Sequence, residues 1–453
     1  MGGSPESSIA GSEFDPVGEL GGKAEMSAAS AIEHGPAASP APVAARASGA
    51  GVDVVFVIHQ IGSSADGGLR SISEMIANAP GLSKCVLTNL ETKTTAAWRA
   101  HADVRIWRMN EQQYTAGDSG PFARLWRGVD RLRNNARMWG LLRELRPAAV
   151  HVNDHRAFWN AIIAAKLVGA PVIFNVRDTM RPGAKSTWAW RLALKLADRF
   201  LVLSKEMEES WRRDLQPASL EPKHASKFAY LYSIVDPAVY GPVDDARRGE
   251  LRSELKMEAG RKAVVYVGRF EEKKAQLPFI EQAIPKLKAE NPDALVYFVG
   301  DFAPEKDAYA AACADAIERL GLQDAVRCVG YSARIADWYR ASDVVALASQ
   351  REGLPRCVIE ALACGATIAT FDVCSTREVV EAHEFGFVVS QGDYAGLSAA
   401  IDRALGDEEL RAAVRVRAPQ FTAQTFDPRR NGARYAEFVK SVVSAKNAEG
   451  AAS

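Results

Sequence analysis

The sequence predicts an α/β protein with two doubly wound, parallel-sheet domains. Short apolar runs alternate with helix-length amphipathic segments from residue 52 onward, and the runs are apolar on both faces, as strands covered by helices on both sides must be. A polar helical segment at residues 241–260 interrupts this alternation once, after which it begins again. A chain of 453 residues is long enough for two such domains of ordinary size.

The predicted elements follow in order along the chain. The first domain spans residues 51–240, and its strands are the runs 52–59, 84–89, 104–109, 148–153, 171–176 and 199–204. Residues 241–260 form the predicted linker. The second domain spans residues 261–425, with strands at 262–268, 294–300, 325–330, 343–349, 366–372 and 386–390. Residues 426–453 are predicted to hold a last helix and a tail.

Residues 1–50 are excluded from this fold. They are rich in Gly, Ala, Ser and Pro and hold too few large apolar side chains to offset the entropy of ordering, so we expect disorder there. The opening stretch "MGGSPESSIAGSEFDPVGELGGK" lacks the basic start and apolar centre of a signal peptide. It is more typical of an expression leader.

The composition narrows the class of protein. The hydrophobic fraction is 47% and the charged fraction 25%, and no apolar run approaches the length of a membrane span, which predicts a soluble protein. Lys plus Arg and Asp plus Glu both count 56, so no global basic charge indicates a nucleic-acid partner. The six cysteines show no paired metal-ligand spacing, which predicts free thiols in a reducing compartment and a cytoplasmic location.

Polar and glycine-rich segments follow several of the predicted strands. They are "QIGSSADGGLR" after 52–59, "RFEEKK" after 262–268 and "QREGLPR" after 343–349. Ligands of open parallel sheets bind outside the carboxyl ends of the strands. These segments are therefore the first place to look for a site.

The stretch "SQREGLPRCVIEALACG", residues 349–365, carries two carboxylates around a predicted short helix. Pro355 suits the first turn and Gly365 the end of that helix, which places Glu352 in the preceding loop and Glu360 about 7 Å along the axis from the loop. This separation favours two contacts to one elongated ligand, with helix-start N–H groups holding a phosphate between them. A ligand with hydroxyls at both ends and phosphate in the middle describes a nucleotide-sugar. The simpler interpretation is two solvated surface carboxylates.

The segment "EGLPRCVIEALACGATIATFDVCSTREVV" resembles the signature of retaining GT-B glycosyltransferases of family four. The resemblance is dense over residues 262–392 and thinner over 52–240. It implies two Rossmann-like domains facing across a cleft, the first for the acceptor and the second for the nucleotide-sugar, with the last helix returning to the first domain. It implies that Glu352 binds the donor sugar, that Glu360 binds the ribose, and that Gly353, Leu354 and Pro355 lie at the sugar and phosphate.

The turn "VGRFEEKKAQ" offers cations for a leaving diphosphate. By resemblance, Arg269 and Lys274 neutralise its charge and Gly268 borders the donor, although Lys273 competes with Lys274 for the inward position. The alternative is a solvated loop in which Arg269 pairs with a neighbouring glutamate.

The first domain is predicted to contribute two glycines and three polar residues to the site. Gly67 and Gly68 match the family's glycine-rich loop beneath the donor phosphate. Arg177 stands where many members carry a histidine that contacts the donor sugar, and Arg177, Asp178 and Asn153 are candidate sugar or acceptor contacts. Since arginine cannot act as a base, no base is assigned here.

No cofactor and no metal are predicted. The chain has no DxD motif after a strand, and Asp53 and Asp154 are poor substitutes. It also lacks GxGxxG and GxxxxGK[ST] motifs in a strand-turn-helix setting, which argues against a dehydrogenase or a P-loop enzyme. We expect the nucleotide-sugar, a UDP- or GDP-sugar, to be a substrate.

Two segments, "PFARLWRGVDRLRNNARMWGLLRELRP" and "KSTWAWRLALKLADRF", combine arginines or lysines with tryptophans and leucines. A basic amphipathic helix of this kind can lie on an anionic membrane, here the inner face, and present a lipid-linked acceptor. The alternative is an ordinary helix with its apolar stripe in the core.

The sequence therefore predicts a retaining, metal-independent glycosyltransferase with a glycan or lipid-linked acceptor, of the kind used in bacterial polysaccharide or lipopolysaccharide synthesis. Two alternatives stay open. The first is an epimerase or hydrolase of the same fold, which would consume donor without an acceptor. The second is a non-catalytic nucleotide-sugar-binding protein, for which the departures at Arg177 and "YSIVD" are the support.

Overall fold

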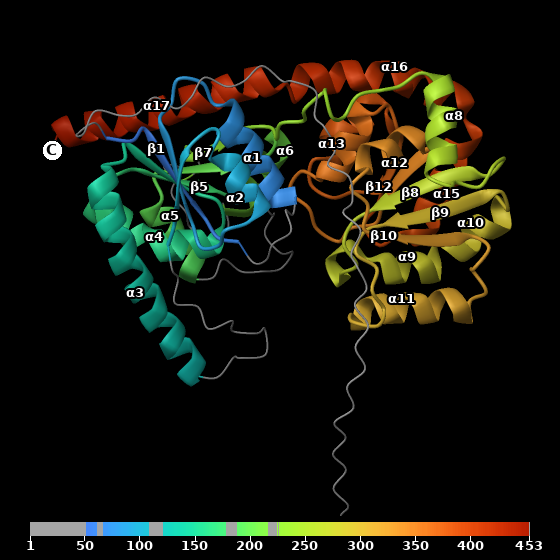
Figure 1. Ribbon diagram of the computed structural model, residues 1–453, viewed down its shortest axis with the longest axis horizontal. Helices are drawn as coiled ribbons and strands as arrows, with labels where there is room; N and C mark the ends of the chain where they lie inside the picture. Colours follow the sequence, from blue (N-terminus) through green and yellow to red (C-terminus); the bar gives the residue numbers. More distant parts are fainter. Residues whose placement is uncertain are drawn as a thin grey trace, which may run out of the picture. The chain divides into compact units, whose positions relative to one another are not determined.

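A computed structural model describes residues 51–60, 67–107, 121–177, 188–215, 224 and 226–452 (Figure 1). It holds two parallel sheets, which confirms the predicted fold class. The first has the order β3-β2-β1-β4-β5-β6-β7 and the second β10-β9-β8-β11-β12-β13. The strands of the first are β1 (Val54–Ile58), β2 (Lys84–Thr88), β3 (Asp103–Ile106), β4 (Ala149–Val152), β5 (Val172–Asn175), β6 (Arg199–Val202) and β7 (Phe228–Tyr230).

The second sheet repeats the same arrangement. Its strands are β8 (Lys262–Val267), β9 (Ala294–Val299), β10 (Val326–Gly330), β11 (Val344–Leu347), β12 (Thr367–Phe371) and β13 (Gly386–Val389). Every pairing between described strands is parallel, and each of the twelve predicted strands is present. β7 was not predicted. It has three residues at the edge of the sheet, and two of them are half-buried.

Helices cover both faces of each sheet (Figure 1). In the first half they are α1 (Gly67–Asn78), α2 (Lys93–Trp98), α3 (Pro121–Leu145), α4 (His155–Leu167), α5 (Trp188–Leu196) and α6 (Lys205–Leu215). In the second half they are α8 (Asp245–Glu254), α9 (Gln276–Gln282), α10 (Ile284–Glu290), α11 (Ala308–Arg319), α12 (Ile335–Ala341), α13 (Arg356–Ala363), α14 (Thr376–Val379), α15 (Tyr394–Gly406), α16 (Glu408–Thr425) and α17 (Pro428–Ala452). Two short 3-10 turns cover Glu272–Lys274 and Glu381–His383.

Strand β1 shows how one strand serves two cores. Val55 and Val57 belong to the cluster that includes residues of α3 and α4, whereas Phe56 and Ile58 belong to the cluster that includes residues of α1 and α17. Alternate residues of a strand point to opposite faces, so a strand with helices on both sides must be apolar throughout. This is why the apolar runs could be recognised in the sequence.

The last helix, α17, packs against α1 of the first half. Tyr435, Ala436 and Val439 are buried in the same cluster as Phe56 and Ile72. The Tyr435 hydroxyl group and His151 Nδ1 on β4 also share a buried hydrogen bond, at 2.8 Å. One face of the first sheet is therefore completed by the end of the chain.

The segment predicted as a linker contains α8, and ion pairs hold this helix against the second sheet. Arg248 and Arg252 pair with the two oxygens of Asp343, just before β11, at 2.6 and 2.5 Å. Burial raises the pKa of Asp343, but the two guanidinium groups have the opposite and larger effect, so the net pKa lies below the usual value. This carboxylate is thereby held ionised at the amino edge of the sheet.

All six cysteines are free thiols, as predicted, and each is buried or half-buried. Burial raises the pKa of the Cys357 thiol to about 12, so it stays protonated at neutral pH. Within the ranges given above, none of the helices is both long and apolar enough to span a bilayer.

Candidate active site

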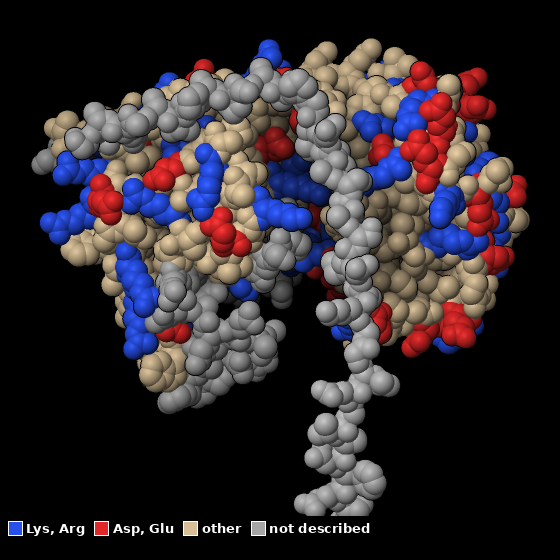
Figure 2. All heavy atoms as spheres, in the orientation of Figure 1, with Lys and Arg blue, Asp and Glu red and all other residues tan. Residues whose placement is uncertain are grey.

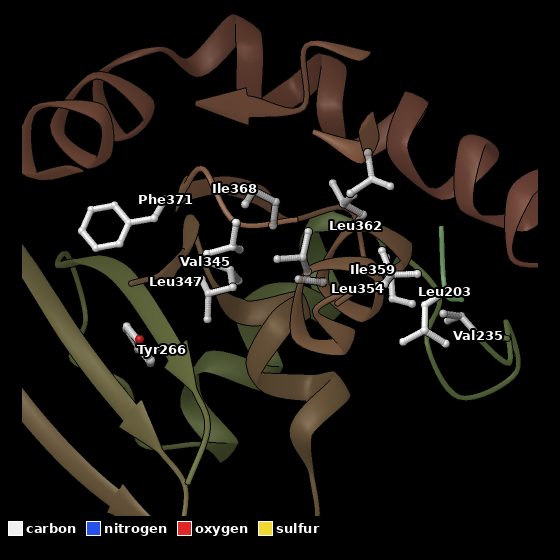
Figure 3. Close-up of a cluster of buried hydrophobic side chains, with 14 of the residues drawn as sticks. Leu203, Val235, Tyr266, Val345, Leu347, Leu354, Ile359, Leu362, Ile368 and Phe371 are labelled. Carbon is white, nitrogen blue, oxygen red and sulfur yellow. The ribbon is translucent and has the colours of Figure 1, made fainter. Parts of the chain in front are cut away.

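The loop between β11 and α13 carries the two predicted carboxylates. α13 begins at Arg356, one residue later than expected, with Pro355 in extended conformation at its N-cap. It ends at Ala363 with Cys364 as its C-cap, and Gly365 follows with a φ of 82°, the left-handed conformation that favours glycine at a helix end. The inner face of α13 packs in the same hydrophobic cluster as Val55 and Val57, and Figure 3 shows Ile359 and Leu362 there with Leu203, which follows β6.

Glu352 forms a close ion pair with Lys274. The distance from Lys274 Nζ to Glu352 Oε1 is 2.6 Å, and the two side chains are only 19% and 12% exposed. Lys274 rather than Lys273 therefore reaches Glu352. The pair joins the turn after β8 to the loop after β11, two strands that are neighbours in the sheet.

The charge of Lys274 is maintained by its partner. Burial alone lowers the pKa of a lysine, but the Glu352 carboxylate raises it, and the net pKa of Lys274 lies above the usual value. The aliphatic part of the side chain lies against Gly268, whose added Cβ would be 3.6 Å from Lys274 Cδ. The site thus holds a permanent cation beside the predicted sugar carboxylate.

Glu360 lies deeper and has a partner of its own. Arg356 Nε donates to Glu360 Oε1 at 2.9 Å, and the two side chains are 10% and 4% exposed. The contact uses one carboxylate oxygen, so Oε2 is the atom that can accept from a ligand hydroxyl. The sequence interpretation of a solvated surface glutamate is excluded for this residue.

Arg356 also connects α13 to the first half of the chain. Its Nη1 donates to Ser71 Oγ on α1 at 3.3 Å and to the Ile234 carbonyl at 3.2 Å. Ile234 belongs to the "YSIVD" segment that departs from the family pattern. This departure therefore lies beside the Glu360 ion pair.

The backbone of the Glu352 loop meets the end of β5 closely. A Cβ added to Gly353 would be 2.2 Å from the Arg177 carbonyl oxygen and 3.3 Å from Met207 Sδ. Only glycine fits at this contact without a shift of the backbone. The Gly353 carbonyl accepts in turn from Ser375 Oγ at 2.7 Å, while the apolar Leu354 side chain is buried.

Arg177 holds the two predicted glycines from the other side. Its Nη1 donates to the Gly68 carbonyl at 2.6 Å and to Asn153 Oδ1 at 3.2 Å, and its Nη2 donates to the Gly67 carbonyl at 3.4 Å. Gly67 is the first residue of α1. The structure thus brings together four of the residues singled out in the first half, namely Gly67, Gly68, Asn153 and Arg177.

Arg269 is not placed as the resemblance implies. Its side chain is 57% exposed and pairs with Glu271 at 3.6 Å, which is the solvated-loop alternative rather than convergence with Lys274. Asp178 lies outside the described residues.

A second connection between the two halves was not predicted. Glu378 on α14 accepts from the Tyr232 hydroxyl group and, at 2.8 Å, from the Glu206 backbone N–H. Burial, followed by the hydrogen bond to Glu378, raises the pKa of Tyr232. Glu378 lies in "STREVV", which was quoted as part of the family signature but given no role.

Among the described residues, no group of three or more His, Cys, Asp and Glu side chains could hold a metal ion.

These observations first define a class of protein. Two parallel-sheet Rossmann-like domains, with a Glu-x7-Glu loop and helix after a central strand of the second, are the arrangement of GT-B proteins. A sequence profile described as "Glycosyl transferases group 1" matches residues 247–421, and one described as "Glycosyltransferase Family 4" matches residues 95–221. The chain belongs to the family four-like glycosyltransferases of the GT-B fold.

Curated relatives are distant. The chain is 26% identical over 196 residues to an N-acetyl-alpha-D-glucosaminyl L-malate synthase of Bacillus anthracis. The aligned region covers 43% of this chain and 49% of that enzyme. It is 25% identical over 286 residues to the UDP-Gal:alpha-D-GlcNAc-diphosphoundecaprenol alpha-1,3-galactosyltransferase of Escherichia coli, which covers 60% of this chain and 70% of that enzyme.

The fold is matched over more of the chain than the sequence is. The crystal structure of Anabaena HepE in complex with UDP-glucose superposes with a TM-score of 0.69 over 86% of this chain and 100% of that one, at 20% identity. At this identity the match shows the fold alone.

Proposed function

We propose that the protein is a retaining, metal-independent glycosyltransferase that transfers a hexose from a UDP-sugar to a lipid-linked or glycan acceptor. The observation that carries the proposal is the presence of two buried ion pairs, Lys274–Glu352 and Arg356–Glu360. Glu352 lies in the loop before α13, and Glu360 lies on α13 itself. Together they offer a carboxylate and a cation at one end of the site and a second carboxylate at the other.

Each group has a chemical task in this proposal. Glu352 accepts hydroxyl groups of the donor sugar, and Oε2 of Glu360 accepts those of the ribose. Lys274 neutralises the negative charge that grows on the diphosphate as the glycosidic bond breaks, because a preorganised cation in a water-poor site is effective there. The leaving diphosphate then takes the proton of the acceptor hydroxyl on the same face of the sugar, which retains the anomeric configuration.

Lys274 has a clear kinetic test. Lys274→Ala is expected to lower kcat more than it raises KM for the donor, since its cation is needed most when the diphosphate departs. Arg269→Ala is the matched control on the same turn and is expected to have a smaller effect. A change in KM alone for Lys274→Ala would assign that residue to ground-state binding.

UDP is the proposed nucleotide, with GDP as the alternative. The Anabaena HepE structure is a complex with UDP-glucose, and the E. coli relative is a UDP-Gal galactosyltransferase by name. Thermal-shift titration with UDP, GDP, ADP and CDP identifies the base. Glu360→Ala is expected to abolish the shift, because the ribose would lose a charged acceptor worth about 1.5 to 3 kcal/mol.

The stereochemistry is tested directly by proton NMR of the product formed from an α-linked UDP-sugar. A retained α configuration supports the proposal, and a β product rejects it. Donor consumption without an acceptor would favour an epimerase or hydrolase. Donor binding without turnover, when lipid-linked and soluble glycan acceptors are both supplied, would favour a binding protein.

The proposed acceptor is lipid-linked, and α3 supplies the support. Of the apolar residues that could have formed its core stripe, Leu125, Trp126, Leu132 and Trp139 are exposed, while the core side of the helix is formed by others such as Met138 and Leu142. The exposed side also carries Arg131, Arg133, Arg137 and Arg143, and Figure 2 shows basic side chains gathered along this helix. Apolar and cationic groups together are what an anionic bilayer attracts.

This surface fits a role at the cytoplasmic face of a bacterial-type membrane, in polysaccharide or lipopolysaccharide synthesis. Leu125→Ser with Leu132→Ser is expected to reduce co-sedimentation with phosphatidylglycerol vesicles. Val416→Ser, which removes another exposed apolar side chain from α16, is the control and is expected to have no effect. Equal sedimentation of all three proteins would reject the membrane contact and favour a soluble glycan acceptor.

A further inference from the structure

Ser375 stands just before α14 in a backbone conformation that serine rarely adopts. Its φ is 75° and its ψ is −7°, in the left-handed region where a Cβ is strained and glycine is preferred. The residue is fully buried, and its side chain does not cap α14. Buried, strained residues persist where the surrounding structure holds them, and they gather at functional sites. The contacts of the Ser375 hydroxyl group show what this side chain does.

The Ser375 hydroxyl group donates its one proton to the β11–α13 loop, residues 348–355. Its Oγ lies 2.7 Å from the carbonyl oxygen of Gly353, which can only accept. The Cys374 thiol is a weaker acceptor and lies farther from this hydroxyl, at 3.7 Å. Ser375 therefore binds the same loop that carries Glu352.

Ser204, which precedes α6, completes a directed chain of hydrogen bonds. Its Oγ is 2.6 Å from Ser375 Oγ, and it accepts from the Met207 backbone N–H at 3.0 Å. Either serine could donate in the contact between them, but only Ser204 as the donor leaves the Ser375 proton for the Gly353 carbonyl. Both serines are fully buried, where such a chain of hydrogen bonds is strengthened by the low dielectric constant. The chain thus runs from the first half of the protein to the β11–α13 loop.

The hydrogen bond to the Gly353 carbonyl also sets the direction of the next N–H group. In a planar trans peptide the Gly353 carbonyl and the Leu354 N–H point in opposite directions, so the Leu354 N–H points away from Ser375. Both loop residues are buried, yet within the part of the chain that the structure describes neither their N–H groups nor any side chain form a hydrogen bond that uses these two donors. Buried backbone N–H groups rarely lack an acceptor. These donors are therefore left for a bound ligand.

We propose that Ser375 is a positioning residue for the transfer reaction, which acts through Gly353 and holds the Leu354 N–H toward the donor. Ser375 does not touch the donor itself. Ser204 holds the Ser375 hydroxyl group in place from the other side. The inference rests on the proposed function, because it takes the loop of Glu352 and Gly353 to be the part of the protein that binds the nucleotide-sugar. Glycine would relieve the strain at position 375 but would lack the hydroxyl group.

Two substitutions remove the same hydroxyl group and differ in strain. Ser375→Ala keeps a Cβ in the left-handed conformation, whereas Ser375→Gly does not, so the glycine variant should have the higher Tm of the two. Both are expected to lower kcat with a UDP-sugar about tenfold or more, because an N–H donor is no longer held in its direction. Equal losses of kcat in two proteins of unequal Tm would assign the effect to the hydroxyl group and not to stability.

Hydrogen exchange of a peptide covering residues 350–357 reports on the loop without any turnover. Exchange in the absence of ligand should be faster in both Ser375 variants than in the parent protein, and Ser204→Ala should show a smaller change of the same sign. Ser398→Ala is the matched control, since it removes another fully buried serine hydroxyl group, one on α15 that has no hydrogen-bond partner. It should change neither the exchange nor kcat.

The proposal is overturned if Ser375→Gly keeps the kcat of the parent protein, or if the losses of kcat follow the Tm values of the two variants. Unchanged exchange of residues 350–357 in both variants would also overturn it. A parent protein that turns over none of the nucleotide-sugars supplied would reject the proposed function. In that case faster exchange in the Ser375 variants would still support the placing of the loop by Ser375, and unchanged exchange would reject both.

Discussion

The carboxyl ends of the two sheets use different chemistry to position the candidate site. In the second half, charged side chains are buried in pairs, Lys274 with Glu352 and Arg356 with Glu360. In the first half, Arg177 donates hydrogen bonds to neutral groups, namely the carbonyls of Gly67 and Gly68 and the side-chain oxygen of Asn153. The loop before α13 and the start of that helix are thus joined by ion pairs, whereas Arg177 meets the start of α1 through backbone carbonyls.

The difference indicates where each half can vary. Breaking a buried ion pair leaves an uncompensated charge, so the donor end tolerates few substitutions. A carbonyl is offered by every residue type, so the first half can change its side chains while the glycine segment keeps its place. The replacement of the family's histidine by Arg177 is a change of this kind.

The largest expected effect breaks the donor end. Arg356→Ala or Glu360→Ala should each lower the free energy of unfolding by about 3 to 5 kcal/mol, because the remaining charge is buried without its partner. Urea denaturation monitored by circular dichroism measures this. The double variant Arg356→Met with Glu360→Leu is expected to recover much of the loss. If both single variants were as stable as the parent, the pair would not be a buried ion pair in solution.

The second prediction concerns a buried ionisable group that the first sheet keeps neutral. Burial, followed by the charge of Arg177, lowers the pKa of His151 to about 3, against an unfolded value of about 6.5. Between these values the unfolded chain binds more protons than the folded one, so stability falls as the pH falls. The expected loss from this group is about 1.4 kcal/mol per pH unit below pH 6.5.

His151→Gln, which can still hydrogen-bond to the Tyr435 hydroxyl group, is the variant for this test. Urea denaturation at pH 6.5, 5.5 and 4.5 should show a smaller dependence on pH in the variant than in the parent protein. Parallel curves for the two proteins would mean that the imidazole titrates normally in the folded state.

The third prediction weakens the contact of Arg177 with Gly67 and Gly68 and leaves the Glu352 and Glu360 ion pairs in place. Arg177→Gln should lower the free energy of unfolding by no more than about 1.5 to 3 kcal/mol, because hydrogen bonds from a charged donor to carbonyls are lost. UDP affinity, measured by calorimetry, is expected to fall less than it does for Glu360→Ala, because Arg177 acts on the nucleotide only through Gly67 and Gly68. A large loss of UDP affinity would show that the two ends of the site are not independent.

The smallest effect is expected at Arg269. Its ion pair with Glu271 is exposed, and exposed pairs contribute little, so Arg269→Ala should alter the free energy of unfolding by less than about 0.5 kcal/mol. Thermal denaturation of the variant beside the parent tests this. A larger loss would mean that Arg269 turns inward in solution and joins the buried charges of the donor end.

Much of the fold could be predicted because the pattern is local. Most strands are buried runs of apolar residues, and this made twelve of the thirteen strands in the described residues visible in the sequence. β7 was missed because three residues at a sheet edge carry too little of that pattern. The helix after Glu352 was placed within a residue of its true start by Pro355 and Gly365.

The site was less predictable because its contacts join distant parts of the chain. Glu352, Glu360 and Lys274 were recognised from their motifs, but the role of Arg356 depends on Ser71 and Ile234, which are far away in the sequence. Nothing local could show that Arg177 binds the carbonyls of Gly67 and Gly68. The direction of Arg269 depends on packing around its turn, so the two sequence interpretations could not be separated.

The return of α17 to the first sheet has a consequence for dissecting the protein. Because Tyr435 and Val439 complete the core around Phe56 and Ile72, a fragment ending near residue 240 would expose that apolar face to water. Such a fragment is expected to aggregate when expressed alone. A circular permutant that joins α17 directly ahead of β1, by contrast, would supply the missing helix and yield a first half that can be purified separately.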